Sequence, residues 1–394
     1  MAPAHLERLF VRNFRSYAEL TLEFAPGLNV FIGPNGAGKT NILEAVHYLG
    51  LGQSFRTARD AEAVRWEEAG FYLKGRRRDE LGLLDIEVAY RAEGGKAVRV
   101  GGRTLSRLSE LFGTLPCVVF TPDELAWLKG PPSVRRRWLD HHLAQVDPTY
   151  AERLGAFRDS LAQRNEVLAG LRGARSSALL EVWTEQYLDT AAEVAAARVS
   201  GLAEIEPLLR EELERVAPGE AAALALQPAA APGARRATGA GERPQGPLRL
   251  DAAPRTAADW RRWYGAELAA AAEEEALHGR TLVGPHRDDL AALLSGRDAR
   301  RYASQGQQRS FVLALKIAEV RRLTDALRRA PLLLLDDIFS ELDPDRRRRL
   351  TWLVEGRLQA FLTTTELALV PREAAARVFH VGGGRAEPLE EALP

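Results

Sequence analysis

One eight-residue stretch near the amino terminus constrains the fold more than any other feature of the chain. Residues 33–40 read GPNGAGKT and match the phosphate-loop pattern G-x-x-x-x-G-K-[ST] in full. A short apolar strand is predicted before it, at 28–32, and an amphipathic helix after it. Glycines let backbone N–H groups converge on an anion, and the helix N-terminus adds its dipole. The order strand, loop and helix therefore predicts an α/β fold that holds a triphosphate.

The loop residues have predicted roles in binding ATP with Mg²⁺. Lys39 is expected to reach the β- and γ-phosphates, and the Thr40 hydroxyl is expected to join the Mg²⁺ shell. The alternative is a chance glycine turn, which the strand and helix on either side argue against. The predicted binding residues of this loop are Gly33, Pro34, Asn35, Gly36, Ala37, Gly38, Lys39, Thr40 and Asn41.

A second motif lies far along the chain, where four leucines at 332–335 precede Asp336 and Asp337. A buried parallel strand that ends in aspartate is the pattern of a Walker B element, because its carboxyl end faces the nucleotide. Asp336 is predicted to hold Mg²⁺ and Asp337 to polarise the attacking water, so Lys39, Asp336 and Asp337 form the predicted catalytic set. The alternative is an apolar strand followed by a solvated acidic turn.

The third motif is a Ser-Gln-Gly-Gln sequence at 304–307, in front of a helical pattern with regularly spaced apolar residues. A serine and a glycine at a helix N-terminus can bind an anion, or they can simply cap the helix. The position shortly before the Asp336 strand favours anion binding. Ser304, Gly306 and Gln307 are therefore added to the predicted ATP-binding residues.

Composition excludes several classes of protein. Lys+Arg and Asp+Glu both number 54, so the chain has no overall basic coat for nucleic acid. Its one cysteine, Cys117, excludes a disulfide scaffold and a cysteine metal cluster. No apolar run approaches the roughly 20 residues of a membrane-spanning helix, so a cytoplasmic protein without membrane contact is expected.

Arginine runs at 76–78, 135–137 and 346–349 have two interpretations, contact with DNA phosphates or pairing with neighbouring carboxylates. We favour a solvated face for 346–349 and leave the other two open. His286, in a Gly-Pro-His-Arg-Asp-Asp sequence, has no partner at metal-ligand spacing, so we predict a structural hydrogen bond for it.

The rest of the chain alternates between β and helical patterns. Strands are expected in the first forty residues, at 70–100, 116–120 and 357–362, and helices at 131–216 and 257–278. Residues 217–249 are rich in Ala, Gly and Pro and predict a flexible excursion, with at most a short strand at 224–226. The predicted domains are 1–130 and 279–394 as the two parts of an ATPase head, and 131–278 as a helical lobe with an insertion near 217–256.

The three motifs occur in the order found in ATP-binding-cassette ATPases. The long separation of Lys39 from Ser304 resembles the split cassette of the Rad50/SMC class, with a helical lobe between the halves. Within that class the sequence is similar to the RecF family. The blocks that carry this resemblance are 13–17, 33–44, 54–57, 120–125, 129–130, 135–140, 284–290, 303–309, 336–343 and 363–365.

The resemblance implies an ABC-type P-loop ATPase head and a homodimer that forms with ATP. Ser304 and Gly306 of one chain would contact the γ-phosphate bound by Lys39 of the other, with residues 340–343 as the D-loop at the interface. The family binds duplex DNA and gapped or junction DNA, and hydrolyses ATP slowly. It works with RecR and RecO to help load RecA in DNA repair and replication restart.

Two positions depart from general cassette chemistry. A switch histidine is expected at the end of the 357–362 strand, where Thr363, Thr364 and Thr365 stand instead. A Q-loop glutamine is also not evident, and Asp123 or Glu124 is its possible substitute. Two other functions compete with a RecF-type ATPase: the ATPase subunit of a transporter, and a clamp that binds ATP with little hydrolysis.

Overall fold

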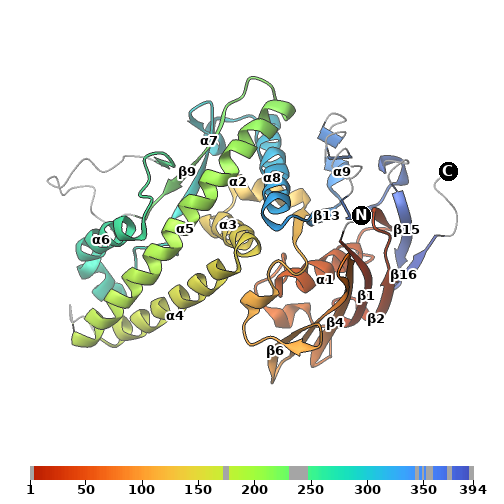
Figure 1. Ribbon diagram of the computed structural model, residues 1–394, viewed down its shortest axis with the longest axis horizontal. Coiled ribbons are helices and arrows are strands. Elements are labelled where there is room, and N and C mark those ends of the chain that lie inside the picture. The colour runs from red at the N-terminus through yellow and green to blue at the C-terminus, as the bar shows by residue number, and fades with distance from the viewer. Residues whose placement is uncertain are drawn as a thin grey trace. The chain divides into compact units, whose positions relative to one another are not determined.

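The computed structural model describes residues 4–171, 177–229, 247–341, 346–347, 350–351, 358–370 and 375–389 (Figure 1). The chain forms two compact units. Unit 1 comprises residues 1–124 and 319–394, and unit 2 comprises residues 125–318. Within the described part of the chain, each helix is too short or too polar to traverse a lipid bilayer.

The central sheet of unit 1 brings the two ends of the sequence together. Its strand order is β16-β15-β3-β14-β13-β8, and all neighbours pair in parallel except β15 and β16. Because β14 lies between β3 and β13 and is parallel to both, the carboxyl ends of these three strands lie at the same edge of the sheet. The strands are β3 (Leu28–Ile32), β8 (Cys117–Phe120), β13 (Leu332–Asp336), β14 (Ala360–Thr364), β15 (Ala375–Gly382) and β16 (Arg385–Pro388).

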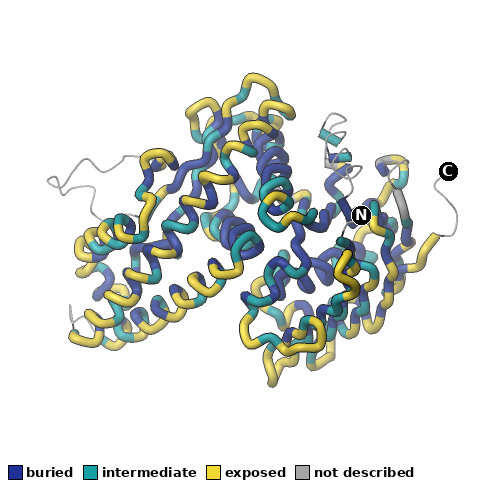
Figure 2. Tube along the Cα trace, in the orientation of Figure 1, coloured by how far each residue is buried: buried dark blue, intermediate teal, exposed yellow. Residues whose placement is uncertain are grey.

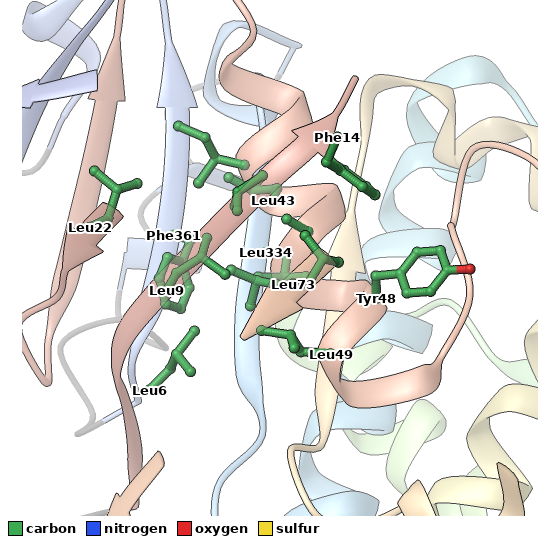
Figure 3. Close-up of a cluster of buried hydrophobic side chains, with 14 of the residues drawn as sticks. Leu6, Leu9, Phe14, Leu22, Leu43, Tyr48, Leu49, Leu73, Leu334 and Phe361 are labelled. Atoms are coloured by element: carbon green, nitrogen blue, oxygen red, sulfur yellow. The ribbon is translucent and has the colours of Figure 1, made fainter. Parts of the chain in front are cut away.

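A second, antiparallel sheet of unit 1 has the order β2-β1-β4-β5-β6-β7. Its strands are β1 (His5–Phe14), β2 (Tyr17–Glu23), β4 (Gly70–Asp79), β5 (Gly82–Arg91), β6 (Gly95–Val100) and β7 (Arg103–Thr104). Helix α1 (Lys39–Leu51) contacts strands of both sheets, which explains why residues 42–51 are all buried. Figure 3 shows Leu43 and Leu49 of α1 in one cluster with Leu9, Leu73 and Leu334. Short 3₁₀ helices lie at Asp60–Ala63, Leu108–Leu111, Pro122–Leu125 and Leu367–Leu369, and α9 at Ile338–Glu341.

Unit 2 combines helices with a small sheet of order β10-β9-β11-β12. Helix α5 packs against α4, α6 and β9. Buried and exposed residues alternate along the helix at short intervals, so one side of it is buried (Figure 2). The helices are α2 (Ala126–Lys129), α3 (Pro132–Val146), α4 (Pro148–Gly170), α5 (Ala178–Val216), α6 (Ala257–His278), α7 (Ala299–Tyr302) and α8 (Gln305–Leu327), which runs on into unit 1. The strands are β9 (Ala222–Gln227), β10 (Leu248–Arg249), β11 (Asp289–Leu294) and β12 (Arg297–Asp298).

The local patterns predicted most elements correctly. The strand at 28–32 and the helix at 257–278 are confirmed at the predicted bounds, and the helical pattern of 131–216 becomes α3, α4 and α5. The last predicted strand was misplaced, because β14 spans 360–364 and not 357–362. The strands β11, β15 and β16 were missed, as were the two-residue strands β7, β10 and β12.

The prediction of a flexible excursion over 217–249 was wrong for its first part. Residues 222–227 form β9, which pairs along its whole length with the missed strand β11. Residues 230–246 lie outside the described residues. Because this pairing joins 222–227 to 289–294, unit 2 extends to residue 318, beyond the predicted lobe boundary at 278.

Candidate nucleotide-binding and catalytic site

The phosphate loop connects the end of β3 to the first turn of α1. Gly36 and Gly38 have φ of 79° and 104°, which side chains other than glycine rarely adopt. Lys39 is only 6% exposed, and its Nζ donates to the carbonyl oxygens of Gly33 at 2.6 Å and Pro34 at 2.9 Å. Burial lowers the pKa of Lys39, although the negative charges of Asp337 and Asp336 act to raise it. The ammonium group is thus held by the loop and is subject to the charges of both predicted catalytic carboxylates.

The tertiary structure joins the two main motifs directly. Thr40 Oγ1 donates to Asp336 Oδ1 at 2.8 Å, although the residues are 296 positions apart. The same Oδ1 accepts a second hydrogen bond from Thr363 Oγ1 at 2.7 Å. A hydroxyl and a carboxylate at the end of parallel strands are the oxygen ligands that Mg²⁺ prefers. Thr40 and Asp336 therefore fit the predicted metal-holding role.

Asp337 follows the end of β13 in an unusual backbone conformation. Its φ is 47°, in the left-handed region, and its N–H donates to Thr363 Oγ1 at 2.9 Å. Ser340 Oγ donates to the Asp337 carbonyl oxygen at 2.7 Å, at the start of α9. The turn after the Walker B strand is therefore held from both sides, by β14 and by α9.

The hairpin turn between β1 and β2 supports the phosphate loop from another side. Tyr17 donates its hydroxyl to the Gly38 carbonyl oxygen at 3.1 Å, and Asn41 Nδ2 donates to Ser16 Oγ at 2.9 Å. A Cβ at Gly38 would lie 2.8 Å from Ser16 Oγ and 2.9 Å from the Tyr17 hydroxyl. Only glycine therefore fits between this turn and the loop. Asn41, predicted to bind nucleotide, also accepts from Arg56 Nη1 at 3.1 Å.

A buried carboxylate next to the site was not predicted to have a role. Glu44 of α1 is 0% exposed and accepts from Arg15 Nε at 2.9 Å and Arg15 Nη2 at 2.5 Å. It also pairs with Arg56 at 3.4 Å and accepts from the Ser54 hydroxyl. The one sequence signal for this cluster is that Glu44 is the single acidic residue of α1, on a face that is mostly apolar. Glu44 thus connects the β1–β2 turn and the 54–57 segment to the phosphate-loop helix.

Replacing Glu44 by Gln is expected to lower the free energy of unfolding by about 2 kcal/mol, because the buried carboxylate loses its charge-assisted hydrogen bonds to Arg15, whose side chain is 18% exposed. Chemical denaturation of the full chain measures this change. Glu19→Gln is the matched control, because Glu19 pairs with Arg12 on the surface, where the Glu19 side chain is 62% exposed and that of Arg12 is 58% exposed. Equal losses in the two variants would contradict the assignment of a buried charge cluster.

The Ser304 motif lies in unit 2, at the N-terminus of α8. The Ser304 Oγ accepts from the Gln307 N–H at 3.2 Å, and the Gln307 side chain accepts from the Ser304 N–H at 2.7 Å. This reciprocal pair is a capping box, so Ser304 caps α8. Ser304, Gln305 and Gly306 are nevertheless all exposed. A part for Ser304, Gly306 and Gln307 in nucleotide binding remains a prediction.

Two of the three arginine runs are engaged within the protein. Arg76 pairs with Asp85 at 2.8 Å and Arg78 with Glu7 at 2.8 Å, while Arg77 pairs with Asp79. In the second run, Arg135 forms a two-point pair with Asp289 at 2.7 and 2.9 Å, and Arg136 donates to the Asp288 carbonyl oxygen at 2.7 Å. These contacts favour the ion-pairing interpretation. In the third run, residues 348–349 lie outside the described residues.

The Gly-Pro-His-Arg-Asp-Asp segment is a hydrogen-bonded loop inside unit 2. His286 Nε2 lies 3.1 Å from the Thr281 carbonyl oxygen, which confirms the predicted structural hydrogen bond. Burial lowers the pKa of His286 to about 4 and raises the pKa of Asp288 to about 6. Among the residues that the structure describes, no group of three or more His, Cys, Asp or Glu side chains is placed to hold a metal ion. The side chains of Asp123 and Glu124, and D-loop residues 342–343, lie outside what is described.

The chain is similar to known proteins over nearly its whole length. The family model described as RecF/RecN/SMC N terminal domain matches residues 5–382. A protein from Heliobacterium modesticaldum named DNA replication and repair protein RecF is 38% identical over 384 residues, which is 96% of this chain and 98% of that protein.

Two solved structures are also similar, both of the recombination mediator protein RecF in the RecFOR pathway, one as RecF-ATPrS and one as RecF-ATP. Their TM-scores are 0.85 and 0.84, each at 29% identity and over 98% of this chain, and 99% and 98% of the solved chains are covered. The chain therefore belongs to the RecF family, and its α/β fold is the ABC-type, SMC-like P-loop ATPase head that its three motifs predicted.

Proposed function

We propose that this protein is an ATP-dependent, DNA-binding recombination mediator that hydrolyses ATP slowly, stimulated by DNA. It dimerises on ATP, binds duplex and gapped or junction DNA, and works with RecR, and through RecO with RecA. The observation that carries the ATPase is the hydrogen bond of 2.8 Å between Thr40 and Asp336, which joins the phosphate loop to the end of the Walker B strand. Similarity to RecF proteins over nearly the whole chain supports the rest.

The residues at this edge of the sheet suit phosphoryl transfer to water, in which catalysis comes from positioning and charge neutralisation. The Lys39 ammonium offsets phosphate charge, and backbone N–H groups of residues 33–40 cradle the phosphates. Thr40 and Asp336 would hold Mg²⁺, which would supply positive charge against that of the phosphates. Asp337 is the proposed general base and would accept a proton from the attacking water.

The proposed dimer completes each nucleotide site with the α8 N-terminus of the second chain. Ser304 and Gly306 are exposed there, at the positive end of the dipole of a long helix. A triphosphate held by Lys39 of one chain would be capped by this helix end. ATP would then favour the closed dimer, because the closed state makes contacts with the nucleotide that a monomer lacks.

Sedimentation velocity with and without ATP and Mg²⁺ tests the dimer. Conversion of monomer to dimer on addition of ATP is expected, and a strictly monomeric ATP-bound species would contradict it. ATP hydrolysis that is stimulated by duplex DNA would exclude the alternative function as the ATPase subunit of a transporter. Failure of the wild-type chain to hydrolyse ATP at all would favour the alternative of an ATP-binding clamp.

Replacing Ser304 by Arg is expected to block the ATP-dependent dimer while nucleotide binding to the monomer stays intact, because a bulky cation would stand in the proposed interface. Ser177→Arg is the matched control, because Ser177 caps α5 in the same way, with Oγ accepting from the Leu180 N–H at 3.1 Å. Both variants lose a helix cap, typically worth about 1 kcal/mol, but only the first should lose the dimer. Loss of ATP binding in the Ser304 variant would refute the proposed division between the two chains.

A further inference from the structure

Thr363 at the end of β14 connects the two Walker B carboxylate residues. Its hydroxyl donates to Asp336 Oδ1 at 2.7 Å and accepts from the Asp337 N–H at 2.9 Å. The side chain is 1% exposed, and Thr363 stands opposite Asp336 in the parallel pairing of β14 with β13. One hydroxyl therefore holds the side chain of one residue and the backbone of the next.

The backbone that Thr363 holds is strained. Asp337 has a φ of 47°, a conformation that costs free energy in a residue with a side chain and persists only where surrounding contacts impose it. The hydrogen bond from its N–H to Thr363 is one such contact. Rotation of this peptide would change the position of the Asp337 side chain after the end of β13.

We propose that Thr363 is a positioning residue for ATP hydrolysis, which sets the Asp336 carboxylate and the Asp337 backbone at the same time. The inference rests on the proposed ATPase function and names how this site is aligned. Thr363 stands where cassette ATPases are expected to carry a switch histidine. The single hydroxyl hydrogen of Thr363 is donated to Asp336. Thr363 therefore influences hydrolysis through the positions of Asp336 and Asp337.

The residue type suits this role. A β-branched side chain in a strand is restricted in χ1, so the hydroxyl is aimed by the backbone of β14 itself. Valine has nearly the same shape but can neither donate to Asp336 nor accept from the Asp337 N–H. Serine keeps both hydrogen bonds.

Steady-state ATP hydrolysis by Thr363→Val and Thr363→Ser tests the proposal. The Val variant should lose about 10- to 100-fold in kcat, the usual effect of removing a group that orients a metal-binding carboxylate, with a much smaller change in KM. The Ser variant should recover most of the rate. Calorimetry gives a second measurement, because the gain in nucleotide affinity caused by Mg²⁺ should shrink in the Val variant and not in the Ser variant.

Thr364→Val is the matched control. Thr364 is also 1% exposed on the same strand, but its hydroxyl donates to the Glu366 carbonyl oxygen at 3.1 Å, away from the carboxylates. Equal loss of kcat in both Val variants, or no loss in Thr363→Val, would overturn the proposal. If Thr363→Val does not fold, Thr363→Ala against Thr363→Ser gives the same comparison. A wild-type chain without ATP turnover would refute the proposed function itself, whereas an active wild type with an unaffected Thr363→Val refutes only this inference.

Discussion

Replacing Lys39 by Arg is expected to reduce ATP hydrolysis by at least about 100-fold, the usual effect of removing one preorganised charge-stabilising donor. The Lys39 ammonium donates to the carbonyl oxygens of both Gly33 and Pro34. Gly33 is already packed so closely that a Cβ there would lie 2.2 Å from the Val381 carbonyl oxygen. A planar guanidinium is larger and spreads its charge, so it cannot replace the ammonium in this space.

Hydrolysis of ATP with and without DNA, together with thermal unfolding, measures this effect. Lys96→Arg is the matched control, because Lys96 also donates to a backbone carbonyl, of Gly52 at 2.7 Å, and pairs with Asp60 at 2.9 Å. The control should keep turnover close to that of the wild type. Unchanged turnover in Lys39→Arg would show that the nucleotide site has been assigned to the wrong residues.

The second large effect is expected in unit 2, where Arg198→Leu should lower the free energy of unfolding by about 3–5 kcal/mol. Arg198 is 3% exposed and donates to both Asp140 oxygens at 2.9 and 3.1 Å, and to the Pro285 carbonyl oxygen at 2.7 Å. Its removal leaves the Asp140 carboxylate buried with a hydrogen bond from the Tyr150 hydroxyl but without its cation. The loss is therefore mainly the cost of an uncompensated charge.

Denaturation followed by tryptophan fluorescence measures this loss, with Arg261→Leu as control. Arg261 joins α6 to Asp189 of α5 at 2.7 Å, but both side chains are largely exposed, so a much smaller loss is expected. The double variant Arg198→Leu with Asp140→Leu should regain part of the stability, because it removes both buried charges. Equal effects of Arg198→Leu and Arg261→Leu would contradict the proposed role of burial.

Much of the site could be predicted because its elements are local in the sequence. The phosphate loop, its strand and its helix occupy 28–51 without interruption, and the leucine strand runs directly into Asp336. Glycines, a helix start and a run of apolar residues each determine backbone conformation over a few positions. The bounds of β3 and β13 therefore needed no knowledge of the rest of the fold.

The supporting contacts could not be predicted, since their residues look ordinary in the sequence. Glu44 reads as one charge on an amphipathic helix, and only the turn at Arg15 and the segment at Ser54 make it a buried junction. Strand β9 likewise was indicated only as a short strand at 224–226, because its full length depends on pairing with β11. Hydrophobic periodicity indicates which face of a helix or strand is buried, but not which distant residues contact that face.

The sequence by itself determined the chemistry of the site: a loop for phosphates, a lysine, and a carboxylate at the end of a buried strand. The tertiary structure alone decided how these parts are aligned, by placing β14 between β3 and β13 so that Thr363 holds Asp336 and Asp337. The physical reason is that local conformation depends on neighbouring residues in the chain. Hydrogen bonds between separate strands depend on sheet order and register, which are set by the packing of the whole unit.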